Sequence, residues 1–163
     1  MIILFCPELT IGTSAIVSSG QKRIIKACEK HWNAHKDNCS GFVKAVAVEI
    51  GIFLPDEKAD PIIKYISKWE TASWWKIRSP KSAGELAEEG YFVLACLTMA
   101  DSGRENGHVA VVTSGYKSSH RGDPRGYWGA YKSVGEKNAT MNYSFDMKRF
   151  ESKVSYFRCM WKR

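Results

Sequence analysis

The chain has 163 residues, 44% of them hydrophobic, a length that supports one domain with one core and is too short for two comfortable domains. Its formal net charge is +7, and residues 101–163 hold 12 Lys and Arg against 6 Asp and Glu, so we expect polyanions to be attracted to that half. The sequence contains no helix-turn-helix, zinc-ligand or aromatic RNA-binding pattern, which argues against a nucleic-acid partner.

Residues 1–20 open with a short apolar run, Met1–Cys6. No Lys or Arg precedes this run, Pro7 and Glu8 interrupt it, and no convincing cleavage site follows. We therefore do not expect an ordinary secretory signal. No apolar run approaches the length of a membrane span, so stable membrane insertion is not expected either. We interpret residues 1–20 as an extension of uncertain role, which an upstream start codon would also explain, and residues 21–163 as the single domain.

Apolar spacing predicts helices in the first half of the chain and strands in the second. Helices are expected over residues 21–32, 39–50, 61–70 and 82–90. The last of these begins with the capping-box pattern Ser82-Ala83-Gly84-Glu85 and ends at Gly90. Strands are expected over residues 91–98, 108–114, 126–131, 141–145 and 153–160. Helices followed by a run of strands predict an α+β fold, with N-terminal helices packed on an antiparallel sheet.

The stretch Lys36–Val43 places a cysteine where a loop gives way to an amphipathic helix. Asp37 or Asn38 is a good N-cap, so Cys39 falls in the first helical turn. Unpaired amide hydrogens and the helix dipole stabilise a thiolate there, so we expect a lowered pKa and a nucleophilic sulfur. The alternative is a buried core cysteine, which would gain nothing from the polar lead-in.

A nucleophilic thiol needs a base, and the chain has four histidines, His31, His35, His108 and His120. His108 follows Gly107 and opens a β-branched run that is typical of a buried strand. At the mouth of such a strand, its imidazole can face the start of a helix packed on the sheet, which is the geometry of a Cys-His pair. A surface histidine at a strand end is the alternative interpretation.

The segments Asn38-Cys39-Ser40-Gly41-Phe42-Val43 and Gly107-His108-Val109-Ala110-Val111-Val112 resemble the signature of NlpC-type papain-like peptidases. Residues 36–43, the helix residues 24–28 and the segment Lys132-Ser133-Val134-Gly135 resemble, more narrowly, the first subfamily of amidase effectors delivered by type VI secretion. The resemblance runs from about Gln21 to the C-terminus. It implies a papain-like NlpC-type fold and hydrolysis of the γ-D-glutamyl–meso-diaminopimelate bond in peptidoglycan stem peptides.

The same resemblance implies a set of partners and a place of action. The expected partners are peptidoglycan stems, a cognate immunity protein and proteins of the secretion tube. Export without a signal peptide and action in the periplasm of a Gram-negative target cell are expected, with the toxin working as a monomer. Related effectors carry a disulfide to the C-terminal strand, which suggests that Cys159 pairs with Cys28 or with Cys6.

Cys39 and His108 are the predicted catalytic dyad, and the backbone N–H of Cys39 is expected to help hold the oxyanion. The family pattern puts the third catalytic position on Trp128, whose indole cannot accept a hydrogen bond from an imidazole N–H. Asp123, His120, Tyr127 and a backbone carbonyl are the alternatives.

Other residues near the dyad are candidate substrate contacts, namely Asp37, Asn38, Ser40 and Trp128, although helix capping and packing explain several of them equally well. Neither a metal nor another cofactor is expected, because no Cys-x-x-Cys pattern occurs and the histidines are not paired with the cysteines.

Two other functions share parts of this pattern. Thiol acyltransferases of the related lipid-modifying class use the same Cys-His chemistry, but their histidine precedes the cysteine in the chain, whereas Cys39 precedes His108 here. A non-catalytic cell-wall binding module would need neither side chain. The chain order and the presence of both residues therefore favour the peptidase.

Overall fold

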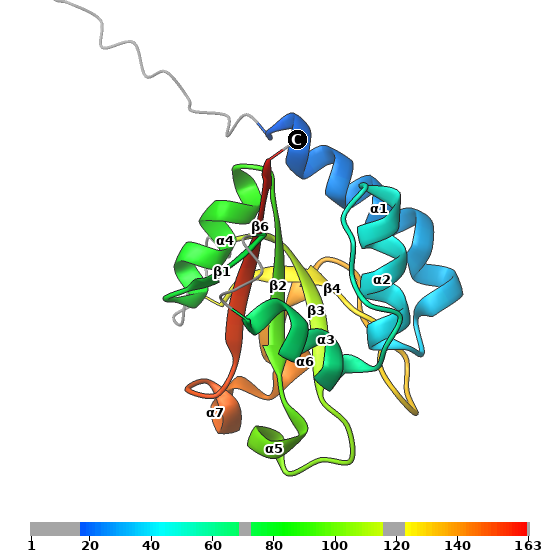
Figure 1. Ribbon diagram of the computed structural model, residues 1–163, viewed down its shortest axis with the longest axis vertical. Helices are drawn as coiled ribbons and strands as arrows, with labels where there is room; N and C mark the ends of the chain where they lie inside the picture. The colour runs from blue at the N-terminus through cyan, green and yellow to red at the C-terminus, as the bar shows by residue number, and fades with distance from the viewer. Residues whose placement is uncertain (1–16, 69–72, 116–122, 163) are drawn as a thin grey trace, which may run out of the picture.

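A six-stranded antiparallel sheet forms the centre of the protein (Figure 1). The computed structural model describes residues 17–68, 73–115 and 123–162. The strands lie in the order β1-β6-β2-β3-β4-β5, and each adjacent pair is antiparallel. Their bounds are β1 Trp74–Ile77, β2 Tyr91–Leu97, β3 His108–Ser114, β4 Arg125–Tyr127, β5 Ala139–Thr140 and β6 Ser155–Lys162.

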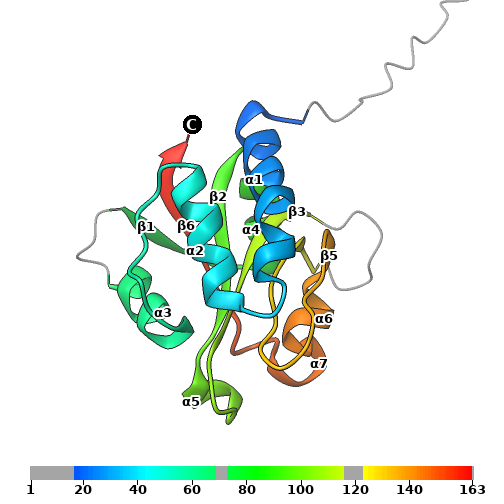
Figure 2. The same cartoon turned by 90° about the vertical axis from the view of Figure 1, so that its right-hand side faces the viewer.

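Helices cover both faces of this sheet (Figure 2). The helices α1 Ser19–His35, α2 Cys39–Glu49 and α3 Ala59–Ser67 lie on one face, and α4 Pro80–Glu88, α6 Met141–Phe145 and α7 Met147–Phe150 lie on the other. The short helix α5, Met99–Ser102, belongs to the connection between β2 and β3. No helix in the described parts of the chain combines the length and the apolar character that crossing a bilayer requires.

The two central strands are apolar on both sides because each sheet face is covered. In β2, Phe92, Leu94 and Cys96 point toward α1 to α3, and Val93, Ala95 and Leu97 point toward α4, α6 and α7. In β3, Val109 and Val111 face the first helical layer, whereas Ala110 and Val112 face the second. These alternating sets form two separate hydrophobic cores, one on each side of the sheet.

The α+β class and the packing of N-terminal helices on an antiparallel sheet are confirmed. The strands expected over residues 91–98, 108–114 and 153–160 correspond to β2, β3 and β6 within two residues, and β4 is shorter than expected. The helix predicted over residues 61–70 begins two residues earlier, as α3, and its last two positions lie outside the described residues.

The strand predicted at residues 141–145 is wrong, because this segment forms helix α6. Met141, Ser144 and Phe145 are buried there, which is the i, i+3, i+4 spacing of a helix face. Tyr143 is exposed instead. Apolar residues at positions 141, 143 and 145 gave the segment the alternation of a strand, but only two of the three are buried.

The prediction that a capping box at Ser82 begins this helix is also wrong, because α4 begins at Pro80. Ser79 is the N-cap, and its Oγ accepts a hydrogen bond of 3.1 Å from the N–H of Ser82. Pro80 takes the first helical position, where a missing N–H costs no hydrogen bond. The end of this helix at Gly90 is confirmed by its left-handed backbone, with φ of 95°.

The predicted bond between Cys28 and Cys159 is not present, because Cys28 is a free thiol. Cys28 belongs to α1, which contacts β2 and β3, whereas Cys159 belongs to β6 on the far side of β2. The alternative partner, Cys6, lies outside the described residues.

Candidate active site

A cleft of about 880 Å³ opens at the end of the sheet where β3 begins. Cys39 and His108, the two residues of the predicted dyad, both line its wall. The volume falls within the 300–1,000 Å³ range of small-molecule sites. The cleft therefore has room for a short peptide beside both side chains.

The cysteine is held by the start of α2. The side chain of Asn38, the N-cap, accepts a hydrogen bond of 2.9 Å from the N–H of Gly41, and Oγ of Ser40 donates to it at 3.2 Å. Cys39 is the first helical residue, as predicted, and it is 8% exposed. An N-cap of this kind fixes the turn that presents the sulfur.

The expected lowered pKa of Cys39 is wrong for the protein without substrate. Burial raises the pKa of this thiol, and the nearby Asp60 carboxylate adds to the rise. The backbone N–H groups of Val109, Ser40 and Cys39 act in the opposite direction and lower the pKa, but burial outweighs them. The contact with Val109 nevertheless joins the sulfur to the strand that begins with His108.

His108 is held by a residue that sequence reasoning missed. Its Nε2 lies 2.8 Å from Oγ of Ser144, a buried residue of α6. Its ring also packs 4.9 Å from the ring of Phe145, measured between centroids. Ser144 is therefore the polar group behind the imidazole for which Asp123 and His120 were the predicted candidates.

The structure places neither of these two candidates beside His108 among the described residues. Asp123 is buried but does not line the cleft, and its carboxylate acts on Tyr156 of β6, whose pKa it helps to raise. His120 lies outside the described residues. Tyr127, the third alternative, interacts with Glu29 of α1, which raises the pKa of the phenol further than burial alone does.

The remaining predicted contacts all border the cleft. Asp37, Asn38, Ser40 and Trp128 line the cleft, as the sequence pattern around the dyad suggested. Trp128 is nonetheless mostly buried, and its carbonyl accepts a hydrogen bond of 3.2 Å from the indole of Trp32. It contributes more to the wall than to the open surface.

The loop before His108 is fastened to α3 by one carboxylate. Oδ1 of Asp60 accepts a hydrogen bond from the N–H of Met99, and Oδ2 accepts one from the N–H of Gly107, both at 2.7 Å. A Cβ on Gly107 would lie 2.6 Å from Oδ2, so a larger residue would force the Asp60 carboxylate to shift. Asp60 thus fixes both ends of the connection that delivers His108.

The opposite lip of the cleft, residues 128–135, is fastened to the turn between α1 and α2. The carbonyl of Lys36 accepts hydrogen bonds from the N–H groups of Ala130 and Gly135, at 3.0 and 2.7 Å. A Cβ on Gly129 would lie 2.2 Å from the carbonyl oxygen of His35, and one on Gly135 would lie 1.8 Å from that of Trp128. Both glycines are therefore required by close backbone packing beside the nucleophile.

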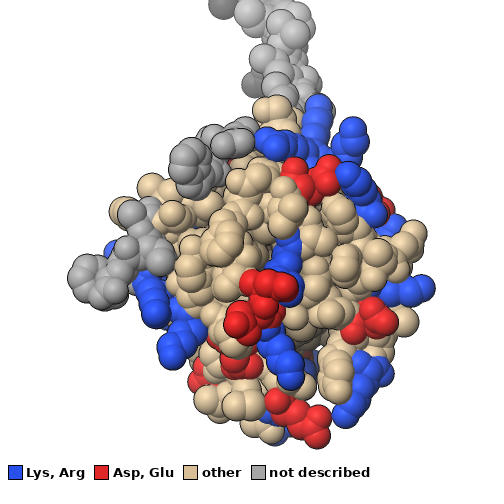
Figure 3. All heavy atoms as spheres, turned by 45° about the vertical axis from the view of Figure 1, so that its right-hand side comes forward, with Lys and Arg blue, Asp and Glu red and all other residues tan. Residues whose placement is uncertain are grey.

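Charge does not gather into one basic patch on the face shown in Figure 3, where Lys, Arg, Asp and Glu are interspersed. The cleft is lined by residues of both charges. The basic ones are Lys58 and Arg104, and the acidic ones are Asp37, Glu105, Glu136 and Asp146. A ligand that complements this lining would carry both positive and negative groups.

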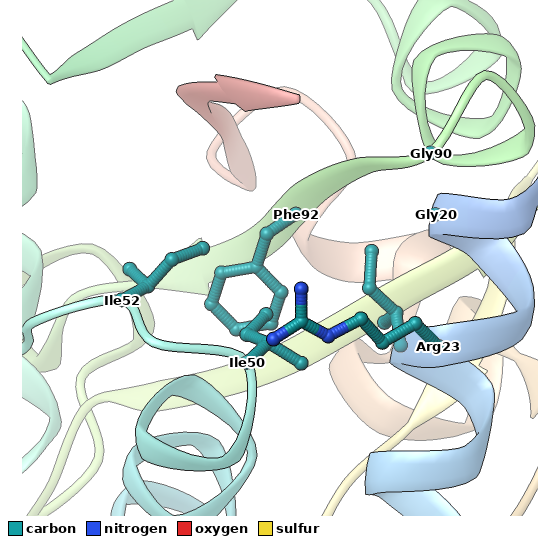
Figure 4. A pocket seen from close by; sticks show the side chains of 7 residues that line it. Gly20, Arg23, Ile50, Ile52, Gly90 and Phe92 are labelled. Atoms are coloured by element: carbon teal, nitrogen blue, oxygen red, sulfur yellow. The ribbon is translucent and has the colours of Figure 1, made fainter. Parts of the chain in front are cut away.

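A second hollow lies between the start of α1 and the loop after α2 (Figure 4). Arg23, Ile50, Ile52 and Phe92 contribute to its lining, and its volume is about 20 Å³. That is space for about one water molecule. It is too small for a substrate, so the chemistry belongs to the large cleft.

The pH dependence of turnover should report the state of His108. Burial, together with the positive charge of Arg104, lowers the pKa of His108 from 6.5 to about 4. The neutral imidazole needed to accept a proton is then present from neutral pH down to about pH 5, and kcat/KM should fall only as the pH approaches 4. Initial rates across this range test the expectation, and an acidic limb near 6.5 would contradict it.

Part of the chain is similar in sequence to a curated peptidoglycan amidase. The chain is 38% identical over 99 residues to the peptidoglycan amidase Tse1 of Pseudomonas aeruginosa. The match covers 56% of this chain and 59% of the relative, less than two thirds of either protein. No protein-family model matches the chain. The similarity confirms the resemblance to amidase effectors that the two motifs indicate.

Proposed function

We propose that this protein is an antibacterial peptidoglycan amidase that hydrolyses the γ-D-glutamyl–meso-diaminopimelate bond of stem peptides. The observation that carries the proposal is that Cys39, at a helix start, and His108, at a strand start, line one cleft in a relative of a peptidoglycan amidase. Residues 21–163 act as one NlpC-type, papain-like domain.

The mechanism begins with both groups neutral, because burial raises the pKa of Cys39 and lowers that of His108. When Nε2 of His108 donates its hydrogen to Oγ of Ser144, the lone pair of Nδ1 is free to accept the thiol proton. The sulfur then attacks the amide carbonyl as that proton leaves. This is general-base activation, in place of the preformed ion pair that a lowered thiol pKa would provide.

The later steps use the same groups. The backbone N–H of Cys39 stabilises the oxyanion at the positive end of α2. The imidazolium of His108 next protonates the departing amine, so the C–N bond breaks and an acyl-thioester remains. Water, deprotonated by His108, hydrolyses the thioester and restores the thiol.

Ser144→Ala should lower kcat by about 10- to 100-fold with little change in KM, because the imidazole loses the hydrogen bond that sets its tautomer and orientation. Ser144→Thr, which keeps the hydroxyl, should retain more activity than the alanine variant. Steady-state kinetics on a purified stem peptide measure both values. A KM effect without a kcat effect would contradict a role on His108.

The control for this experiment is Ser133→Ala, since Ser133 also lines the cleft but has no hydrogen bond with His108. It should leave kcat near the wild-type value. Equal losses in the two variants would show that any change in the cleft wall slows turnover.

Delivery and place of action complete the proposal. The protein is delivered by type VI secretion and acts in the periplasm of a Gram-negative target, where its substrate lies. Its partners are secretion-tube proteins and an immunity protein that protects the producer.

Mass spectrometry of purified muropeptides after digestion tests the bond. The expected products are fragments ending in D-glutamate and fragments beginning with free diaminopimelate. Cleavage at another bond, or no cleavage, would overturn the proposed specificity.

A further inference from the structure

Among the described residues, Arg104 is a cation in the cleft wall without an acidic partner. It lines the cleft together with Cys39 and His108, and its charge acts on the imidazole. In the described parts of the chain, no carboxylate forms an ion pair with its guanidinium. The cleft lining therefore includes a positive charge, close to the base, that the proposed mechanism does not use.

The acidic residues nearby are engaged elsewhere or stand apart from it. Glu105, the next residue, pairs with Lys132 across the cleft mouth, with 3.4 Å between Nζ and Oε2. Asp146 also lines the cleft but forms no ion pair with Arg104. An anion supplied by a ligand would therefore be the first full ionic partner of this guanidinium.

The exposed Arg104 side chain packs against an aromatic ring, and its backbone is anchored. Its central carbon lies 5.4 Å from the ring centroid of Phe150, an arrangement typical of a cation on an aromatic face. Arg149 lies over the same ring, at 5.0 Å, but does not line the cleft. The backbone N–H of Arg104 donates to Oγ of Ser102 at 3.2 Å, and Asp60 fixes both ends of this loop. Less side-chain freedom remains to be lost on binding.

We propose that Arg104 binds the free α-carboxylate of the glutamyl residue whose side-chain carbonyl Cys39 attacks. This inference rests on the proposed function. In a γ-linked glutamyl residue, only the α-carbon and two methylene groups separate that carboxylate from the scissile carbonyl. A carboxylate held beside His108 would thus orient the carbonyl toward the sulfur, and the planar guanidinium matches it with two parallel hydrogen bonds. Arg104 is then a specificity-determining residue for stems with an unmodified glutamate.

The test compares two synthetic tripeptides, L-alanyl-γ-D-glutamyl-meso-diaminopimelate and the same peptide with the glutamyl α-carboxylate converted to an amide. Wild-type protein should cleave the acid with a kcat/KM about 10- to 100-fold higher than the amide, the size expected for a charge-assisted contact. Arg104→Gln should cleave both peptides at similar rates, and Arg104→Lys should keep part of the preference.

Arg149→Gln is the matched control, because Arg149 shares the Phe150 ring but not the cleft. It should keep the wild-type preference for the acid. Binding of the two peptides to the Cys39→Ala variant, with and without Arg104→Gln, measures the preference without turnover.

The outcomes separate the two proposals. Cleavage of both peptides by wild-type protein without a preference for the acid would overturn the role of Arg104 and leave the amidase function standing. Arg104→Gln variants that stay as selective as wild type would also overturn it. Tighter binding of the acid that depends on Arg104, in a protein that cleaves neither peptide, would support the carboxylate site and contradict the proposed hydrolysis.

Discussion

Cys39→Ala is expected to lower hydrolysis of stem peptides by at least about 10⁴-fold, because no other side chain can form the acyl intermediate. The fold should persist, since alanine fits the buried first turn of α2 and the cap from Asn38 to Gly41 does not involve the sulfur. Product formation by chromatography measures the loss, and thermal unfolding checks the fold. Hydrolysis retained by the Cys39→Ala variant would contradict the cysteine-amidase mechanism.

The control for that variant is Cys28→Ala. Cys28 is a free thiol in the same hydrophobic core, but it does not line the cleft. Activity should stay close to the wild-type value, even if the smaller side chain costs some stability. A comparable loss in both variants would attribute the effect of Cys39→Ala to core packing.

Toxicity should depend on the compartment into which the protein is placed. The chain fused to a periplasmic export signal is expected to lyse a Gram-negative host, because peptidoglycan lies outside the inner membrane. The same chain expressed without that signal should be tolerated. Turbidity and colony counts after induction measure the difference, which should amount to loss of most viable cells in one culture and none in the other.

The exported Cys39→Ala variant completes this experiment, and its host should grow normally. A toxin that acts on a cytosolic target would give the reverse pattern and kill without export. Equal killing from both compartments would contradict a wall substrate.

The features that the sequence predicts best are local ones. Asn38 caps the helix that presents Cys39 through a contact three residues away, so its chemistry is readable from the segment alone. The continuous apolar runs of β2 and β3 reflect burial on both faces and are equally readable. These local patterns are sufficient to place Cys39 at a helix start and His108 at a strand start.

The role of Ser144 could not be predicted, because it depends on whether residues 141–145 form a helix or a strand. Met141 and Phe145 share a face in a helix and also in a strand, so their burial fits both. Ser144 lies beside that face only in the helix, where it reaches His108. The choice is made by packing against β3 and α7, which no local pattern encodes.

The prediction that Cys39 has a lowered pKa is wrong for a related reason. The N–H groups at the helix start do lower the pKa of Cys39, as the sequence implies. Burial in the surrounding core raises this pKa by more. That core is assembled from segments distant in the chain, such as the strand that contains Val109. The effect of burial on the pKa of Cys39 therefore could not be predicted from the sequence.

The lip formed by residues 128–135 is held by main-chain atoms, since the Lys36 carbonyl and the two close-packed glycines fasten it. The exposed side chains of Tyr131 and Val134 line the cleft without taking part in that attachment. Replacing either side chain should therefore leave the main-chain attachment of the lip intact. Substitutions at Tyr131 and Val134 can therefore alter the shape of the cleft mouth while the backbone beside Cys39 keeps its position.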